Sequence, residues 1–393
     1  MIQNLEPGIR ELVEEFQSNG KPCPSKQTIA NRRTGYLNST VLAGESPKPE
    51  REFLDVVNGI KIKVYKPTNE DNLPLTIYFH GGCFISGGFE THDAQLRQIA
   101  VQSNSIVISI KYRLAPEYTY PTAHDDVYQA VLGIKEQGHK YGGNPERMVF
   151  VGDSAGGQLA LATTLKLKKL TSWLPEQQIL IYPMLDPKGS SQSYKENGSD
   201  YIITANMLLS GFDLYTNNDP KVLSEPDLNL MSADYRGLPP TTIITAEFDP
   251  LRDEGETLHE LMLAHDVEVN CERYSGVIHG FFQLSGVSES AKRCIASISK
   301  QIKTRRATQK RLQLNQLKPF SIHYLGKKCL FVFCIKHYIV VFCVSTVWLP
   351  ATSKEASTFK LTLACSFDDH RATALFTKTN FFVWFNQVNM CRQ

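Results

Sequence analysis

One short segment, residues 149–157, places a serine between glycines directly after an apolar run. Val149–Val151 favours a buried strand, Gly152–Gly156 has the spacing Gly-x-Ser-x-Gly, and the residues after Gly157 favour a helix. A strand that turns sharply into a helix strains the backbone at the serine, and the flanking glycines leave room for the turn. The serine hydroxyl is then held at a helix N-terminus, where developing negative charge is stabilised. Taken alone, the spacing also fits an ordinary tight turn.

Two residues farther along the chain match the partners that a nucleophilic serine needs. A serine hydroxyl requires a base to remove its proton, and the base requires an acid to orient it. Asp249 follows the strand-like run Thr241–Ala246, and His279 follows the alternating run Val267–Tyr274. Both therefore fall beyond the carboxyl ends of expected parallel strands, where ligands bind in such sheets. The order Ser154, Asp249, His279 is that of strand–turn–helix serine enzymes, and we expect a catalytic triad.

Glycines also follow an earlier expected strand. Leu75–Phe79 is apolar and continues into His80, Gly81 and Gly82. Glycines after a strand let backbone N–H groups point into a cavity, as the binding of a tetrahedral oxyanion requires. We expect the amides of Gly81, Gly82 and Ala155 to form this oxyanion hole. His80 is expected to brace the loop and not to act as a second base.

In kind and order these motifs resemble the hormone-sensitive lipase family of α/β-hydrolases, which includes bacterial esterases, arylacetamide deacetylases and plant carboxylesterases. The resemblance covers roughly residues 10–305 and rests on His80–Gly82, Tyr112–Glu117, Gly152–Gly157, Asp249–Gly255 and His279–Phe281. It implies the α/β-hydrolase fold, which has a mostly parallel central sheet flanked by helices and a helical cap. It also implies hydrolysis of carboxylic esters, with short to medium acyl chains, through an acyl-enzyme intermediate.

One departure from the family pattern is Cys83, which stands where the family usually has a third glycine. Its side chain would narrow the acyl pocket or make the site sensitive to thiol reagents. Two other activities also stay open. An amidase or deacetylase would use the same triad, and in plants the same fold and cap serve as a small-molecule receptor that has lost the catalytic histidine. Because His279 is present, we expect an enzyme.

Up to residue 305 the remaining sequence alternates between strand-like and helix-like segments. Strands are expected at 52–56, 61–65, 75–79, 106–110, 148–151, 178–182, 242–245 and 267–274, and helices at 93–103, 123–138, 158–170 and 254–265. The later strands are apolar runs, typical of parallel strands that are covered on both faces. The first two are more polar and alternate, which indicates an antiparallel edge.

Two segments interrupt this alternation, residues 1–45 and 186–236, and both have helical patterns. Inserted helices at the carboxyl end of a sheet would cover the active site, and the resemblance implies a cap that shapes the substrate pocket. We therefore expect N-terminal cap helices in 1–45, a hydrolase core in 46–185 and 237–305, and a cap insertion in 186–236.

The sequence changes character in the tail, residues 306–393. Five of the nine cysteines fall there, at Cys329, Cys334, Cys343, Cys365 and Cys391. Three interpretations stay open: a membrane anchor over the apolar run 329–349, a disordered extension, or a segment translated from outside the original coding sequence. Lys336 and His337 stand within the apolar run, where charge is costly in a bilayer, and disordered chains are usually poor in aromatic residues. We expect the tail not to be part of the hydrolase fold.

Composition narrows the choice of partners and compartment. The net charge of +2 gives no excess of basic residues for nucleic acid, and we expect no nucleic-acid or membrane partner. The cysteines and histidines lack paired metal-ligand spacing, so no metal or cofactor is expected. The N-terminal sequence does not read as a signal peptide, which favours the cytoplasm. The expected partner is a small-molecule ester, and a homodimer stays open because members of the family are often dimers.

Overall fold

The computed structural model describes residues 2–21, 24–315, 321–325, 328–335, 338–345, 359–364 and 371–376. They divide into two compact units at residue 306, and each unit is described by itself. In the first unit eight strands form one sheet in the order β1-β2-β4-β3-β5-β6-β7-β8. The strands are β1 (Arg51–Val57), β2 (Ile60–Lys66), β3 (Leu73–Phe79), β4 (Ile106–Lys111), β5 (Gly143–Asp153), β6 (Gln177–Ile181), β7 (Thr241–Phe248) and β8 (Val269–Ile278).

The sheet is mostly parallel with an antiparallel edge, as the sequence predicts. Strand β2 pairs antiparallel with both β1 and β4, while the pairs from β4–β3 through β7–β8 are parallel. All eight expected strands are present within a few residues of their predicted bounds. The parallel arrangement brings the carboxyl ends of β3, β5 and β7 to one end of the sheet, together with the residues that follow each strand.

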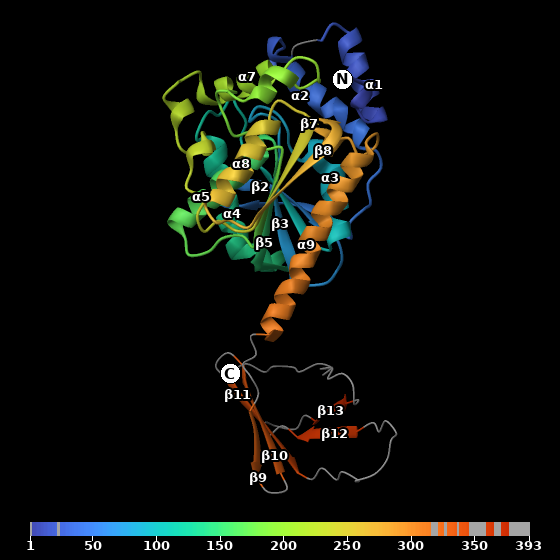
Figure 1. The fold of residues 1–393 in the computed structure, drawn as a ribbon, viewed down its shortest axis with the longest axis vertical. Helices are drawn as coiled ribbons and strands as arrows, with labels where there is room; N and C mark the ends of the chain where they lie inside the picture. Colours follow the sequence, from blue (N-terminus) through green and yellow to red (C-terminus); the bar gives the residue numbers. More distant parts are fainter. Residues whose placement is uncertain are drawn as a thin grey trace. The chain divides into compact units, whose positions relative to one another are not determined.

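Helices cover both faces of the sheet (Figure 1). Helices α4 (Thr122–Gln137), α5 (Ala155–Leu170) and α8 (Arg252–Ala264) contribute to one hydrophobic core, and α3 (Phe89–Ser103) and α9 (Glu289–Asn315) contribute to the other. Strand β5 contributes side chains to both cores: Met148 and Phe150 lie in the first core, and Val149 and Val151 lie in the second. Since successive side chains point to opposite faces, a strand buried on both sides must be apolar at every position.

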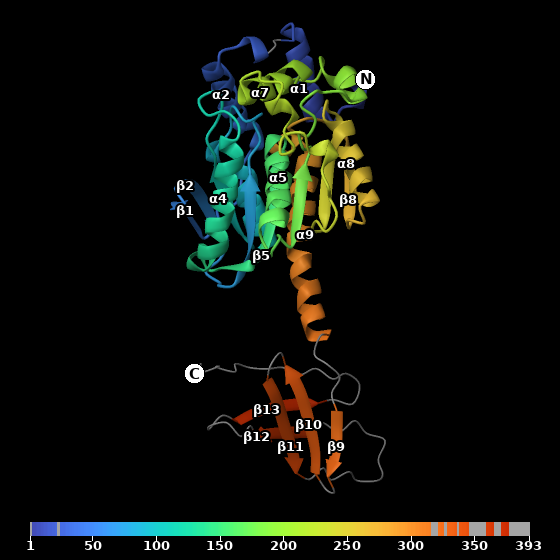
Figure 2. The same ribbon diagram turned by 90° about the vertical axis from the view of Figure 1, so that its left-hand side faces the viewer.

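Further helices gather at one end of the sheet, where Figures 1 and 2 both show α1, α2 and α7 together. They are α1 (Pro7–Ser18), α2 (Ile29–Asn38), α6 (Gln192–Asn197) and α7 (Ala205–Thr216). The N-terminal pair is tied to the 186–236 segment by an ion pair between Lys21 and Asp200. Arg32 of α2 also donates to Ser210 (3.2 Å) and to the carbonyl of Met207 (3.3 Å) on α7.

In the second unit β9 (Ser321–Leu325), β10 (Lys328–Ile335) and β11 (Tyr338–Ser345) form an antiparallel sheet, and β12 (Phe359–Ala364) pairs with β13 (Arg371–Phe376). The apolar run considered as a membrane anchor therefore contains two strands, β10 and β11, and not a single helix. Lys336 and His337 lie outside the described residues. Across the ranges that the structure describes, none of the helices combines the length and apolar character needed to cross a membrane.

Helix α9 has no counterpart among the expected elements, and it continues to Asn315, beyond the residue where we expected the hydrolase core to end. Its buried residues Ile295, Ile298 and Ile302 pack against the sheet in the second core.

Removal of residues 307–393 should leave the melting temperature and the esterase activity of the first unit unchanged, because the described members of both cores lie at or before Ile302. A truncation after Ser290 would remove three buried isoleucines and should not fold, since each such loss costs about 2–5 kcal/mol. Thermal melts followed by circular dichroism compare the two proteins. A 306-residue protein that melts far below the full chain would contradict the prediction.

His124 joins the core helix α4 to the 186–236 segment. Its Nδ1 lies 2.8 Å from the Tyr215 hydroxyl, and its Nε2 lies 3.1 Å from the carbonyl oxygen of Asp227. The imidazole also stacks on the rings of Phe84 and Tyr215. Burial lowers the pKa of His124 to about 4, so the ring is neutral at neutral pH.

His124 should make the stability of the protein fall as the pH falls from about 6.5 to about 4. In this window His124 binds a proton in the unfolded chain, at the ordinary histidine pKa, but not in the folded chain. The free energy of unfolding therefore falls by about 1.4 kcal/mol for each pH unit. Urea denaturation at several pH values measures the free energy of unfolding. Between about pH 6.5 and about pH 4 this free energy should fall less steeply for His124→Gln than for the wild type. The matched control is the exposed His139→Gln, which should keep the slope of the wild type. Equal slopes in all three proteins would refute the role of His124.

Candidate active site

The turn between β5 and α5 holds Ser154 in a strained backbone conformation, with φ of +55°. The turn is tight because a methyl group at Gly152 would overlap the carbonyl of Gly156, and one at Gly156 would overlap the carbonyl of Phe79. The Ser154 amide donates to the carbonyl of Ile181 on β6 (2.8 Å), which fixes the turn against the sheet. Left-handed backbone at a non-glycine residue costs about 1–3 kcal/mol and persists only where the surroundings impose it.

The structure brings Ser154, His279 and Asp249 together in hydrogen-bonding order. Nε2 of His279 lies 3.0 Å from Oγ of Ser154, and Nδ1 lies 2.8 Å from Oδ2 of Asp249. Asp249 is fully buried, and its other oxygen accepts the Leu251 amide at 2.7 Å. Since a carboxylate only accepts, the imidazole carries its hydrogen on Nδ1 and leaves Nε2 free to accept the serine proton. This geometry fits a serine activated by a base that an acid orients.

Asn197 supports this arrangement, although no sequence signal pointed to it. It lies at the end of α6, is buried, and donates from Nδ2 to the carbonyl of Asp249 at 3.1 Å. The residue that positions the acid thus comes from the segment that we expected to be a cap insertion. Tyr182 packs its ring against His279, with 4.5 Å between ring centroids.

The loop after β3, residues 80–88, is called the oxyanion loop below, and it corrects our expectation for Gly81. The N–H of Gly81 donates to Oδ1 of Asp153 at 2.8 Å, so its only hydrogen is already used by a buried carboxylate. The next two residues, Gly82 (φ +124°) and Cys83 (φ +55°), turn the chain. In the described part of the molecule, the N–H groups of Gly82 and Cys83 have no hydrogen-bond acceptor. Ala155 opens helix α5, so its N–H has no partner within that helix.

His80 braces this loop, as expected. It is fully buried, its Nδ1 donates to the carbonyl of Gly81 at 2.9 Å, and its ring stacks on Tyr112 at 4.1 Å. Burial, together with the nearby His92, lowers the pKa of His80 to about 3. The ring is therefore neutral at physiological pH and too weak a base to compete with His279.

Cys83 is 4% exposed, and a methyl group at Gly211 of α7 would overlap its backbone and side chain. The contact shows that α7 lies over the carboxyl end of the sheet, directly above the oxyanion loop. Burial raises the pKa of the Cys83 thiol to about 11. Because the thiolate is the reactive form of cysteine, the buried neutral thiol does not favour sensitivity to thiol reagents.

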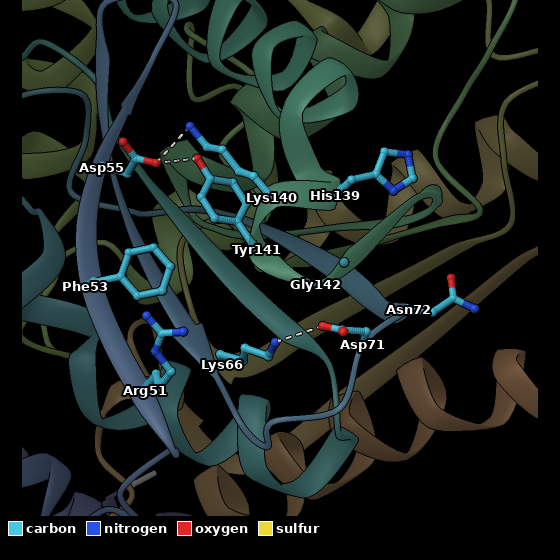
Figure 3. Close-up of a pocket in the computed structure, with 11 residues that line it drawn as sticks. Arg51, Phe53, Asp55, Lys66, Asp71, Asn72, His139, Lys140, Tyr141 and Gly142 are labelled. Carbon is cyan, nitrogen blue, oxygen red and sulfur yellow. Dashed lines mark hydrogen bonds and ion pairs between the residues drawn. The ribbon is translucent and has the colours of Figure 1, made fainter.

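A separate cavity of about 650 Å³ lies at the other end of the sheet (Figure 3). Its lining includes Arg51 and Phe53 from β1, Asn72 just before β3, and Gly143 at the start of β5. Gly143 pairs with Leu73 of β3 and Gly152 pairs with Phe79, so the length of β3, roughly 20 Å at about 3.3 Å per residue, separates this cavity from Ser154. This cavity is therefore separate from the arrangement of Ser154, His279 and Asp249.

Comparison with known proteins supports the fold described above. Residues 76–283 match a family described by its alpha/beta hydrolase fold. Carboxylesterase NlhH of Mycobacterium tuberculosis is 33% identical over 297 residues, which cover 73% of this chain and 92% of the relative. The ethyl acetate hydrolase of Pseudomonas putida is 29% identical over 72% of this chain and 92% of its own length.

A solved structure of similar form is the hyperthermophilic esterase of the archaeon Pyrobaculum calidifontis. It is 31% identical, superposes with a TM-score of 0.72, and the match covers 77% of this chain and 99% of the esterase. The family match spans more than half of the chain and includes residues 80–88, Ser154, Asp249 and His279. The chain therefore belongs to the hormone-sensitive lipase-like family of α/β-hydrolases, and it is a carboxylic ester hydrolase.

Proposed function

We propose that Ser154, His279 and Asp249 are the catalytic triad of this ester hydrolase. The observation that carries the proposal is the pair of hydrogen bonds that His279 makes to the other two side chains, at 3.0 Å and 2.8 Å. His279 accepts the proton of Ser154 as the hydroxyl attacks the ester carbonyl, and Asp249 stabilises the imidazolium that forms. His279 then gives the proton to the leaving alcohol, and water releases the acyl group by the reverse sequence of proton transfers.

The oxyanion of the tetrahedral intermediate binds to the amides of Gly82, Cys83 and Ala155 in this proposal. Gly82 and Ala155 were expected from the sequence, and Cys83 replaces Gly81 because the Gly81 amide donates to Asp153. The left-handed backbone at Cys83 explains why glycine is the usual residue at this position. Each such donor contributes about a hundredfold or more to the rate.

Short to medium acyl chains are the proposed substrates. Ser154 is only 3% exposed, and α7 of the cap places the buried Phe212 and Tyr215 against Phe84 of the oxyanion loop. A site closed in this way favours small acyl groups, and one relative is an ethyl acetate hydrolase. We also keep as proposals the cap formed by residues 1–45 and 186–236, a location in the cytoplasm, and a homodimer.

Ser154→Ala should abolish hydrolysis of p-nitrophenyl butyrate, with a fall in kcat of about four orders of magnitude or more, because the nucleophile is lost. The melting temperature should not fall, since alanine fits wherever serine does. Ser224→Ala, which changes an exposed serine, is the matched control and should keep full activity. Substantial turnover by the Ser154 variant would refute the triad.

A series of p-nitrophenyl esters should give the highest kcat/KM between acetate and octanoate and a steep fall at palmitate, because the closed cap has no room for a long chain. The corresponding p-nitroanilides test the alternative reaction with the same acyl groups. Hydrolysis of the anilides as fast as the esters would identify an amidase or deacetylase. A maximum at palmitate would contradict the proposed chain length.

A further inference from the structure

Polar side chains, part-buried near α2 and fully buried near the sheet, connect the N-terminal helix α2 to the oxyanion loop. The connection begins at Tyr36 of α2, whose hydroxyl donates to Oε1 of Gln283 at 2.9 Å. Gln283 in turn donates from Nε2 to the carbonyl of Thr91 at 3.0 Å, and its own carbonyl accepts Gln95 Nε2 at 2.9 Å. Gln283 thus holds the first turns of α3, and it lies four residues after His279 in the chain.

The connection continues through His92 to Asp153, the residue directly before Ser154. His92 is fully buried, and its ring meets the Tyr36 ring edge-on with 6.1 Å between centroids. Nε2 of His92 lies 3.1 Å from Oδ1 of Asp153 and donates to it, since a carboxylate only accepts. The same carboxylate accepts the Tyr78 hydroxyl at 2.7 Å and the Gly81 amide at 2.8 Å.

Asp153 remains ionised despite its burial. Burial alone would raise the pKa of Asp153, but His92, the Tyr78 hydroxyl and the Gly81 N–H outweigh it and hold this pKa below its ordinary value. A charged carboxylate in a dry interior forms hydrogen bonds roughly twice as strong as those between neutral groups. Asp153 therefore holds the Gly81 amide of the oxyanion loop in place, and the amides of Gly82 and Cys83 follow directly in the chain.

We propose that this series of hydrogen bonds and ring contacts, which passes from Tyr36 through Gln283, Thr91 and His92 to Asp153, couples the docking of α2 to the geometry of the oxyanion hole. Asp153 and Tyr36 are then positioning residues: Asp153 orients the loop through Gly81, and Tyr36 makes that orientation depend on the cap. The inference rests on the proposed oxyanion donors. A shift of about 1 Å in a catalytic group can cost a hundredfold in rate, so a connection of this kind controls kcat without touching the substrate.

A second contact between the same elements supports the coupling. Arg33, also on α2, donates from Nε to the carbonyl of Ile85 in the oxyanion loop at 2.8 Å. The same guanidinium binds the carbonyl of Ala115 at 2.9 Å and forms an ion pair with Glu117. Helix α2 thus contacts the oxyanion loop directly through Arg33, and through Tyr36 it contacts His92, which donates to Asp153.

Tyr36→Phe tests the proposal, because it removes the hydroxyl and keeps the ring against His92. We expect kcat for p-nitrophenyl butyrate to fall about threefold to tenfold, as for the loss of one hydrogen bond, with KM unchanged. The Ki of phenethyl trifluoromethyl ketone, which forms a tetrahedral adduct with the serine, should rise by the same factor. Active sites are counted with a fluorophosphonate, so that a smaller folded fraction does not lower the measured kcat.

Asp153→Asn should lower kcat more, by about a hundredfold, because the loop loses its charged anchor. If both residues act through one connection, the double variant should be no slower than Asp153→Asn alone. The exposed Tyr118→Phe is the matched control and should behave as the wild type. If the Asp153 variant does not fold, the kcat and the ketone Ki of Tyr36→Phe decide alone.

Two results would overturn the coupling: a Tyr36→Phe protein with the kcat and ketone Ki of the wild type, or effects of the two substitutions that multiply in the double variant. Either result, together with an inactive Ser154→Ala protein, would reject the coupling and leave the triad in place. An active Ser154→Ala protein would instead reject the proposed function itself.

Discussion

Gly156 lies so close to the carbonyl of Phe79 that no side chain fits between them, and the catalytic end of the molecule depends on this contact. Phe79 ends β3 and Gly156 belongs to the first turn of α5, so the contact sets Ser154 beside the start of the oxyanion loop. The parallel pairing of β3 with β5 places both strand ends at the same level. The strained backbone of Ser154 is stable because two neighbouring strands hold it on either side.

The same interior gives its titratable groups opposite charge states. Asp153 stays ionised because three donors surround it. Glu254 is equally buried, but burial raises its pKa well above the ordinary value, although the amides of Leu185 and Asp186 donate to it. His80 stays neutral because burial and the nearby His92 lower its pKa by more than Asp153 and the Gly81 carbonyl raise it. Burial penalises every charge alike, and the number and charge of the donors decide which groups remain ionised.

The sheet could be predicted from the sequence, as could the placement of Ser154, Asp249 and His279 just after strands, because both depend on local patterns. Buried strands are apolar at every position, and the glycines around Ser154 mark a turn that few other residues allow. The contacts of Gly81 and Asn197 could not be predicted in this way. Both depend on which polar groups the fold brings together, and Gly81 donates to a residue 72 positions away in the chain. Helix α9 was missed because it lies beyond the last recognisable motif.

Residues 1–45 and 186–236, which we propose to form the cap over Ser154, are far apart in sequence and meet through few polar contacts among the described residues, one of them the Lys21–Asp200 ion pair. Neither stretch supplies a strand to the sheet. Each stretch nevertheless reaches the surroundings of Ser154, because Asn197 donates to the carbonyl of Asp249 and Arg33 donates to the carbonyl of Ile85. Evolution therefore cannot exchange either stretch as an independent module, since a change that alters the substrate pocket also moves a side chain that holds the residues around Ser154.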